Sequence, residues 1–140
     1  MQNALRISNA AALRREKIKE GMKAKAAKGL GLGKPPFGYR IGVDGTFRLV
    51  PDQAKVVELI YKKYLSSENE GVRAIALSLN NEGLRTRTGN RWSMVTIRDI
   101  LRNTAYIGTY RRFGLRIPGS YEPIVTPEDF RLVQDKMQRL

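Results

Sequence analysis

The residue types that most often perform enzymatic chemistry are missing from this sequence. Its 140 residues include no cysteine and no histidine, which excludes disulfides, histidine acid–base catalysis and nearly every structural zinc site. The serines therefore have no histidine that could activate them, and no Ser-Lys motif takes its place. We expect no catalytic residue, no metal site and no cofactor in this chain.

The segment GLGLGK, residues 29–34, has the glycine content of a phosphate-binding loop. A Walker A loop requires the pattern G-x-x-x-x-G-K-[ST] after a strand. Here Pro35 follows Lys34, and the residues before the segment favour a helix. Nucleotide hydrolysis is therefore not predicted, and we expect no enzymatic activity from this chain alone.

A large positive charge is the strongest chemical signal in the composition. The 26 lysines and arginines outnumber the 13 acidic residues, giving a net charge of +13 and an isoelectric point near 10.4. Such a chain attracts polyanions, and nucleic acid is the expected partner. Binding to an anionic membrane would require a helix with large apolar residues opposite its charges, and residues 1–28 offer mainly alanine there. Apolar runs are too short to span a bilayer and no secretory signal is recognisable, so we expect a cytoplasmic protein without membrane contact.

Arginines and hydroxyl residues gather around a predicted helix–loop–helix unit. Residues 71–81 and 94–102 have helical periodicity, and LRTRTGNRW, residues 84–92, is the cationic loop between them. This order follows the logic of a helix-turn-helix, whose second helix points its first residues at the major groove, although the loop is longer than the standard turn. Arginine can hold a guanine edge or a phosphate bidentately, and hydroxyl groups can donate to phosphates. The candidates from this pattern are Thr86, Thr88, Ser93, Thr96, Arg98 and Arg102.

The second helix of this unit leaves a plainer interpretation open. Arg98 and Arg102 lie on its polar face and could simply be solvated, with Asp99 beside them. Trp92 precedes the helix, and we expect it to anchor the core rather than to stack on a base. The apolar residues of this helix expected to face inward are Met94, Ile97 and Leu101.

The Gly/Pro-rich residues 29–36 are predicted to be a linker that follows DNA. Glycine allows the backbone to approach a ligand closely, and proline limits the entropy lost on binding. Lys28, Lys34 and Arg40 bring positive charge to this segment, as in the arms that read the minor groove. An ordinary interdomain linker explains the composition equally well.

The remaining elements are predicted from periodicity and turn chemistry. Residues 1–28 favour one protruding basic helix with little apolar surface to bury. The Asp44-Gly45 turn predicts a hairpin that pairs residues 39–41 with 47–49. These elements predict a mainly α-helical fold with small antiparallel β ribbons, of the α+β class. Further helices are predicted after Pro51 and after Thr126, a strand within 105–112, and a loop or second strand within 113–125.

With its elements in this order, the chain resembles the recombinase domain of large serine recombinases, a family of phage integrases and excision enzymes of mobile elements. The resemblance runs from about Gly33 to Met137 and rests on PFGYR, IALSLNNEGLRT, RW before a capped helix, and ILRNTAYIGTY. It implies that residues 1–28 end a helix from a catalytic domain, that 29–36 are a linker over the minor groove, and that 37–140 dock in the adjacent major groove.

The resemblance also implies a role, which is sequence-specific binding to double-stranded DNA at an attachment or recombination site during integration, excision or inversion. The family's nucleophilic serine domain and zinc-ribbon cysteines are not matched, so we expect a DNA-binding piece of a larger enzyme. The full-length protein is expected to be oligomeric on DNA, with a monomer allowed for this piece alone. Family positions carried over as DNA contacts are Lys34, Tyr39, Arg40, Arg85, Thr86, Arg87, Arg91, Ser93, Thr96 and Arg98.

Two other classes of function remain open at this point. An RNA- or ribosome-binding module would need aromatic platforms for unpaired bases, for which Trp92, Tyr110 and Phe113 are the candidates. A protein-interaction module would dock the first helix on a partner, and its complex would survive high salt because counterion release would not drive it.

Overall fold

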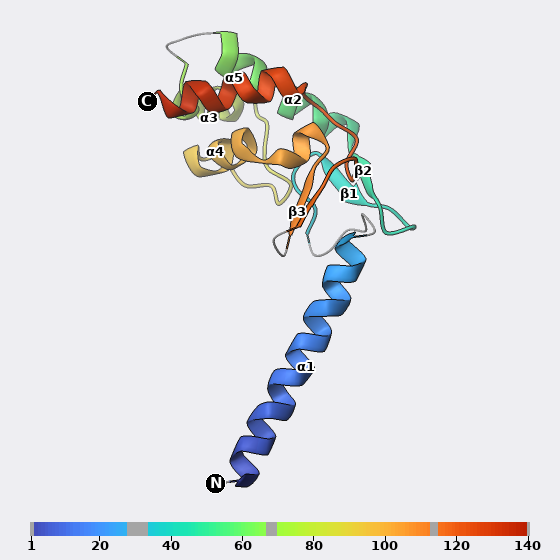
Figure 1. Ribbon diagram of the computed structural model, residues 1–140. Helices are drawn as coiled ribbons and strands as arrows, with labels where there is room; N and C mark the ends of the chain where they lie inside the picture. The colour runs from blue at the N-terminus through green and yellow to red at the C-terminus, as the bar shows by residue number, and fades with distance from the viewer. Residues whose placement is uncertain (1, 28–33, 67–69, 113–114, 140) are drawn as a thin grey trace.

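The structure, a computed structural model, describes residues 2–27, 34–66, 70–112 and 115–139. Within these residues, four helices and two small ribbons form a body from which the N-terminal helix projects (Figure 1). The mainly helical α+β class is therefore confirmed. The helices are α1 Gln2–Ala27, α2 Pro51–Ser66, α3 Val72–Asn81, α4 Met94–Arg102 and α5 Pro127–Gln138, and a short 3₁₀ helix, η1, spans Thr104–Ile107. One ribbon consists of strands β1 Tyr39–Ile41 and β2 Phe47–Leu49. The other ribbon consists of β3 Tyr110–Arg112 and β4 Leu115–Ile117.

Helix α1 is exposed over all the residues whose side chains are described, 11–24. Its larger apolar side chains, Leu13, Ile18 and Met22, keep 58%, 56% and 42% of their surface exposed. Figure 1 shows the helix pointing away from the body. Residues 11–24 of the helix therefore bury no face against the described part of this chain, as the thin apolar stripe predicts.

The first hairpin has the register that its sequence predicts. Strand β1 pairs antiparallel with β2, so that Tyr39 lies opposite Leu49 and Ile41 opposite Phe47. Asp44 holds the turn, because its carboxylate accepts hydrogen bonds from the Thr46 amide at 3.1 Å and the Thr46 hydroxyl at 2.7 Å. Gly45 supplies the positive φ, +81°, that this turn requires.

Helices α2 to α5 enclose an apolar core. Helix α3 packs against α4, and α2 contacts α3, α4 and α5. Each helix contributes residues at helical spacing, which is why one face is apolar and the other charged. The fully buried members include Val57, Ile60, Ile75, Leu79, Ile97, Leu101 and Val133.

Two predictions about local structure were wrong. Met94 was expected to face inward, yet 43% of its surface is exposed, and Ile100 occupies the core with Ile97 and Leu101 instead. Met94 is the first residue of α4 and lies at the rim of the core. Residues 105–107 were expected to begin a strand, but they belong to η1, where the Asn103 side chain caps the turn by accepting from the Ala105 amide at 2.9 Å.

Aromatic side chains attach the ribbons to the helices. The Phe47 and Tyr121 rings stack with centroids 4.0 Å apart, and Tyr39 lies 4.8 Å from Tyr121 and 6.0 Å from Tyr106. The Tyr39 hydroxyl donates to the Glu122 carbonyl at 2.5 Å and the Ala105 carbonyl at 3.2 Å. The buried Tyr39 hydroxyl thus satisfies carbonyls in distant segments. The aromatic cluster therefore fixes the first ribbon in place as well as filling the core.

Candidate nucleic-acid interface

The beginning of α4 is fixed by its cap and by the residue before it. The Ser93 hydroxyl accepts from the Thr96 amide at 3.2 Å, which confirms Ser93 as the N-cap. Before the cap, the Asn80 side chain donates to the Trp92 carbonyl at 2.9 Å and accepts from the Trp92 amide at 2.7 Å. This two-way contact holds the chain that enters α4 against the end of α3. The positive end of the α4 dipole therefore has a fixed direction.

The loop between α3 and α4 is an ordered turn. The Thr86 amide donates to the Asn90 carbonyl at 2.9 Å, and the Asn90 amide donates back to the Thr86 hydroxyl at 3.2 Å. Gly89 has a φ of +83° within this turn. Arg85 is exposed and donates to the carbonyls of Asn80 and Leu84 at the end of α3. The predicted loop residues are thus held in one conformation.

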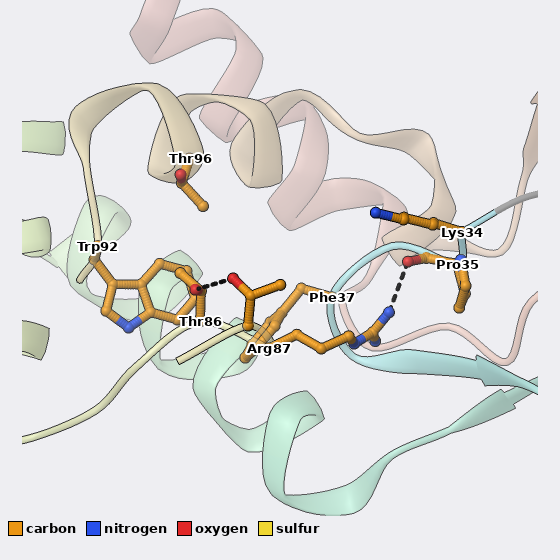
Figure 2. A pocket seen from close by; sticks show the side chains of 8 residues that line it. Lys34, Pro35, Phe37, Thr86, Arg87, Trp92 and Thr96 are labelled. Carbon is orange, nitrogen blue, oxygen red and sulfur yellow. Dashed lines mark hydrogen bonds between the residues drawn. The ribbon is translucent and has the colours of Figure 1, made fainter. Parts of the chain in front are cut away.

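A cleft of about 430 Å³ lies between this loop, α4 and the described end of the linker. Figure 2 shows Lys34 and Pro35 on one side and Trp92 on the other, with Phe37, Thr86 and Arg87 between them and Thr96 above. Trp92 is 4% exposed and meets the Phe37 ring edge-on at 5.1 Å, so it is a core residue, as expected. The predicted site residues that line this cleft are Lys34, Thr86, Arg87 and Thr96.

Arg98 and Arg102 lie apart from that cleft. They line a different hollow of about 260 Å³, together with Tyr64, Val72 and Met137. Arg102 is exposed, whereas Arg98 is partly buried. The structure therefore divides the predicted set between two flanks of α4, with Thr96 on the linker side and the two arginines on the side of α2 and α5.

Tyr39 has a different place from the one its prediction as a DNA contact requires. Its side chain has no exposed surface and lies in the aromatic cluster, where burial raises the pKa of its hydroxyl. We therefore revise its role to support of the ribbon. Arg40, the next residue on β1, is exposed and pairs across the ribbon with Arg48. Arg91 is exposed before α4, and Lys28 lies outside the described residues.

Sequence reasoning missed two side-chain amides and an apolar pair. Asn80 fixes Trp92, and Gln53 contacts both Gly38, just before β1, and Arg87. Met94 and Val95 expose 43% and 61% of their surface on the first turn of α4. Of these residues, only Val95 could have been found from the sequence, because helical spacing places it on the outer face of α4. The amide contacts join distant segments and leave no local pattern in the sequence.

Two kinds of feature are absent from the part of the chain that the structure describes. No group of acidic residues there is arranged to hold a metal ion. None of the described helices is long and apolar enough to cross a membrane.

Comparisons with known proteins agree on one family. The family model described as Recombinase matches residues 51–139. A Bacillus subtilis (strain 168) protein described as "Putative DNA recombinase" is 28% identical over 113 residues, covering 77% of this chain and 21% of that protein. The solved structure "Crystal Structure of a LSR-DNA Complex" has a TM-score of 0.72 at 23% identity, covering 88% of this chain and 38% of its own. "Sequence Requirements of the Listeria innocua prophage attP site" has a TM-score of 0.69 at 25% identity, covering 89% and 52%.

Proposed function

Because the chain belongs to the Recombinase family, we propose that it binds double-stranded DNA sequence-specifically at a recombination site, while another domain of a serine recombinase carries out strand exchange. The relative from Bacillus subtilis is described as a DNA recombinase, and the neighbour at 25% identity concerns a prophage attP site. The chain spans 21% of that relative's length, so strand exchange itself is part of the proposal. This role implies a cytoplasmic protein and an enzyme that is oligomeric on DNA.

The observation that carries this proposal is the shared cleft. The linker end, the α3–α4 loop and α4 meet there, and they bring Lys34, Thr86, Thr96 and the capped α4 N-terminus together. A helix N-terminus with fixed amides favours a phosphate, and nearby cations add an attraction that depends on salt. In this proposal, Lys34, Arg40, Arg85 and Arg91 contact phosphates, and the first turn of α4 faces the bases. Lys28, Thr86, Ser93, Thr96, Arg98 and Arg102 remain proposed contacts.

The aromatic residues argue against the RNA-binding alternative. Recognition of unpaired bases needs exposed aromatic platforms. Trp92 and Tyr110 are 4% and 6% exposed, and Phe113 lies outside the described residues. The protein-interaction alternative is supported by α1, whose exposed apolar side chains are available to another domain.

A salt-dependent titration tests this function. It compares random duplex DNA, single-stranded RNA and duplexes that cover the ends of the element encoding the protein. We expect tight binding to the duplex of one element end, with an affinity that falls steeply with salt. The slope of log K against log salt concentration should become shallower by about 0.9 for each phosphate contact removed. Equal and weak binding to all three ligands would refute the proposed function.

A further inference from the structure

Arg87 makes an unusual set of contacts for an exposed arginine. Its Nη1 donates to the Pro35 carbonyl at 2.8 Å, and its Nη2 donates to the Pro36 carbonyl at 3.0 Å. The same Nη2 also donates to the carbonyl of Tyr39. One guanidinium in the α3–α4 loop therefore binds three carbonyls of the chain that leads from the linker into β1. Figure 2 shows the first of these contacts, from Arg87 to the Pro35 carbonyl.

Gln53 completes this arrangement from the first turn of α2. Its side-chain carbonyl accepts from Arg87 Nη2 at 2.8 Å and from the Gly38 amide at 2.9 Å. Gly38 has a φ of +101°, and a Cβ there would lie 3.2 Å from Ile124. We call Arg87, Gln53 and the carbonyls of Pro35, Pro36 and Tyr39 the Arg87 clasp.

The chemistry of this segment explains why an arginine is needed. Proline has no amide proton, so Pro35 and Pro36 can be held by hydrogen bonds only through their carbonyls. The planar guanidinium carries several donors in a fixed fork and can satisfy several carbonyls together. Lysine has a single nitrogen and cannot reproduce that fork.

We infer that Arg87 is a positioning residue and not a contact to DNA. It couples the linker to α4, the helix whose first turn is proposed to face the bases. Its terminal nitrogens are directed at the chain's own carbonyls, so they are not available for a bidentate contact to a phosphate or a guanine. The clasp sets the point at which the linker leaves the body relative to α4. The linker and α4 can then engage neighbouring stretches of DNA in one register. This inference rests on the proposed function.

Three variants separate positioning from direct contact. Arg87→Lys keeps the charge but loses the fork, and Gln53→Ala disturbs the clasp without changing any charge. The matched control is Arg91→Ala, which removes another exposed arginine of the same loop. The full chain is used throughout, with hydroxyl-radical footprinting on the duplex that the wild-type protein binds.

We expect Arg87→Lys and Gln53→Ala to lose protection at the linker end of the footprint and to keep it at the α4 end. Affinity should fall about tenfold, because Pro35 and Pro36 are then held in place only on binding, and the salt slope should stay unchanged. Arg91→Ala should instead make the salt slope shallower by about one unit and weaken the whole footprint. A full footprint for both clasp variants would overturn the inference, as would a shallower salt slope for Gln53→Ala.

A second measurement does not need DNA. Trp92 is the only tryptophan in the chain, and it lies beside Phe37 in the cleft that Pro35 and Arg87 of the clasp also line. Acrylamide should quench its emission more strongly in Arg87→Lys and Gln53→Ala than in the wild-type protein or Arg91→Ala. Equal quenching in all four proteins contradicts the clasp. If wild-type protein binds no DNA while the quenching differs, the proposed function fails and the clasp stands as a structural contact.

Discussion

At the scale of single residues, the charged side chains of this domain differ in what they are free to do. Arg87 and Arg85 donate to backbone carbonyls, although both are exposed. Lys34 and Arg91 are also exposed, and neither side chain donates to a backbone carbonyl of the described residues. Among the described residues, the hydrogen bonds of Arg85 come from Nη1 alone, whereas Arg87 uses both terminal nitrogens. An arginine in a basic loop is therefore a candidate DNA contact only if it keeps a terminal nitrogen that the protein does not use.

The exposed apolar residues of α4 lead to a prediction about base reading. Val95 exposes 61% of its surface on the first turn, the part of a reading helix that meets base edges. An apolar side chain there can contact the methyl group of thymine. We expect Val95→Ala to weaken target binding by about 1 kcal/mol, and replacement of target thymines by uracil to weaken the wild-type protein similarly.

Leu77→Ala is the matched control for this prediction, since Leu77 is also 61% exposed but belongs to α3. Its affinity should equal that of the wild-type protein. If Val95→Ala responds to the change from thymine to uracil as strongly as the wild-type protein does, the methyl contact is not made by Val95.

At the scale of elements, the sequence predicted what depends on local periodicity. The hairpin register followed from the Asp-Gly turn, and the α4 cap followed from Ser93. Contacts between distant segments were not predictable. Nothing near Gln53 or Asn80 in the sequence indicates that their amides bond to residues 34 and 12 positions away. The placement of Tyr39 in the core likewise depends on Tyr106 and Tyr121, which the fold brings from elsewhere.

The first hairpin gives a prediction at this scale. Hydrogen bonds from Thr46, followed by Arg48, lower the pKa of Asp44 to about 2 from its ordinary 3.8. A lowered folded-state pKa means that the carboxylate stabilises the turn above pH 3.8 and that this contribution is lost as the pH falls through about 2. We expect Thr46→Ala to raise the pKa of Asp44 toward 3.8 in a carbon-detected NMR titration. Thr88→Ala, outside this hairpin, should leave it unchanged; an unaltered Asp44 titration in Thr46→Ala would show that the turn is held differently.

At the scale of the whole molecule, the body is held by its tyrosines as much as by its helices. All six tyrosines of the chain are at most 6% exposed. The hydroxyls of Tyr39, Tyr61 and Tyr106 donate to carbonyls 39 or more positions away in the sequence. The tyrosines therefore connect the linker end, the ribbons and α4, and the stability of the proposed DNA-binding surface depends on these contacts.

This arrangement predicts alkaline unfolding. Burial, the largest cause, raises the pKa of Tyr39, Tyr61, Tyr64, Tyr106 and Tyr121 above the ordinary value of 10. Because the folded-state pKa is raised, the stabilisation is complete below pH 10 and is lost as the pH rises above it, by up to about 1.4 kcal/mol per pH unit for each tyrosine. Tyrosinate absorbance of these five residues should therefore rise only together with the loss of helical circular dichroism. The same chain in denaturant, whose tyrosines are solvated, should titrate near pH 10 without a coupled transition.

Tyr61→Phe removes one ionising group and its 2.8 Å hydrogen bond to the Ile100 carbonyl. The variant should therefore be less stable at neutral pH, yet its stability should fall less steeply above pH 10. Reversible ionisation of several tyrosines in the fully folded protein near pH 10 would show that the cluster is open to water.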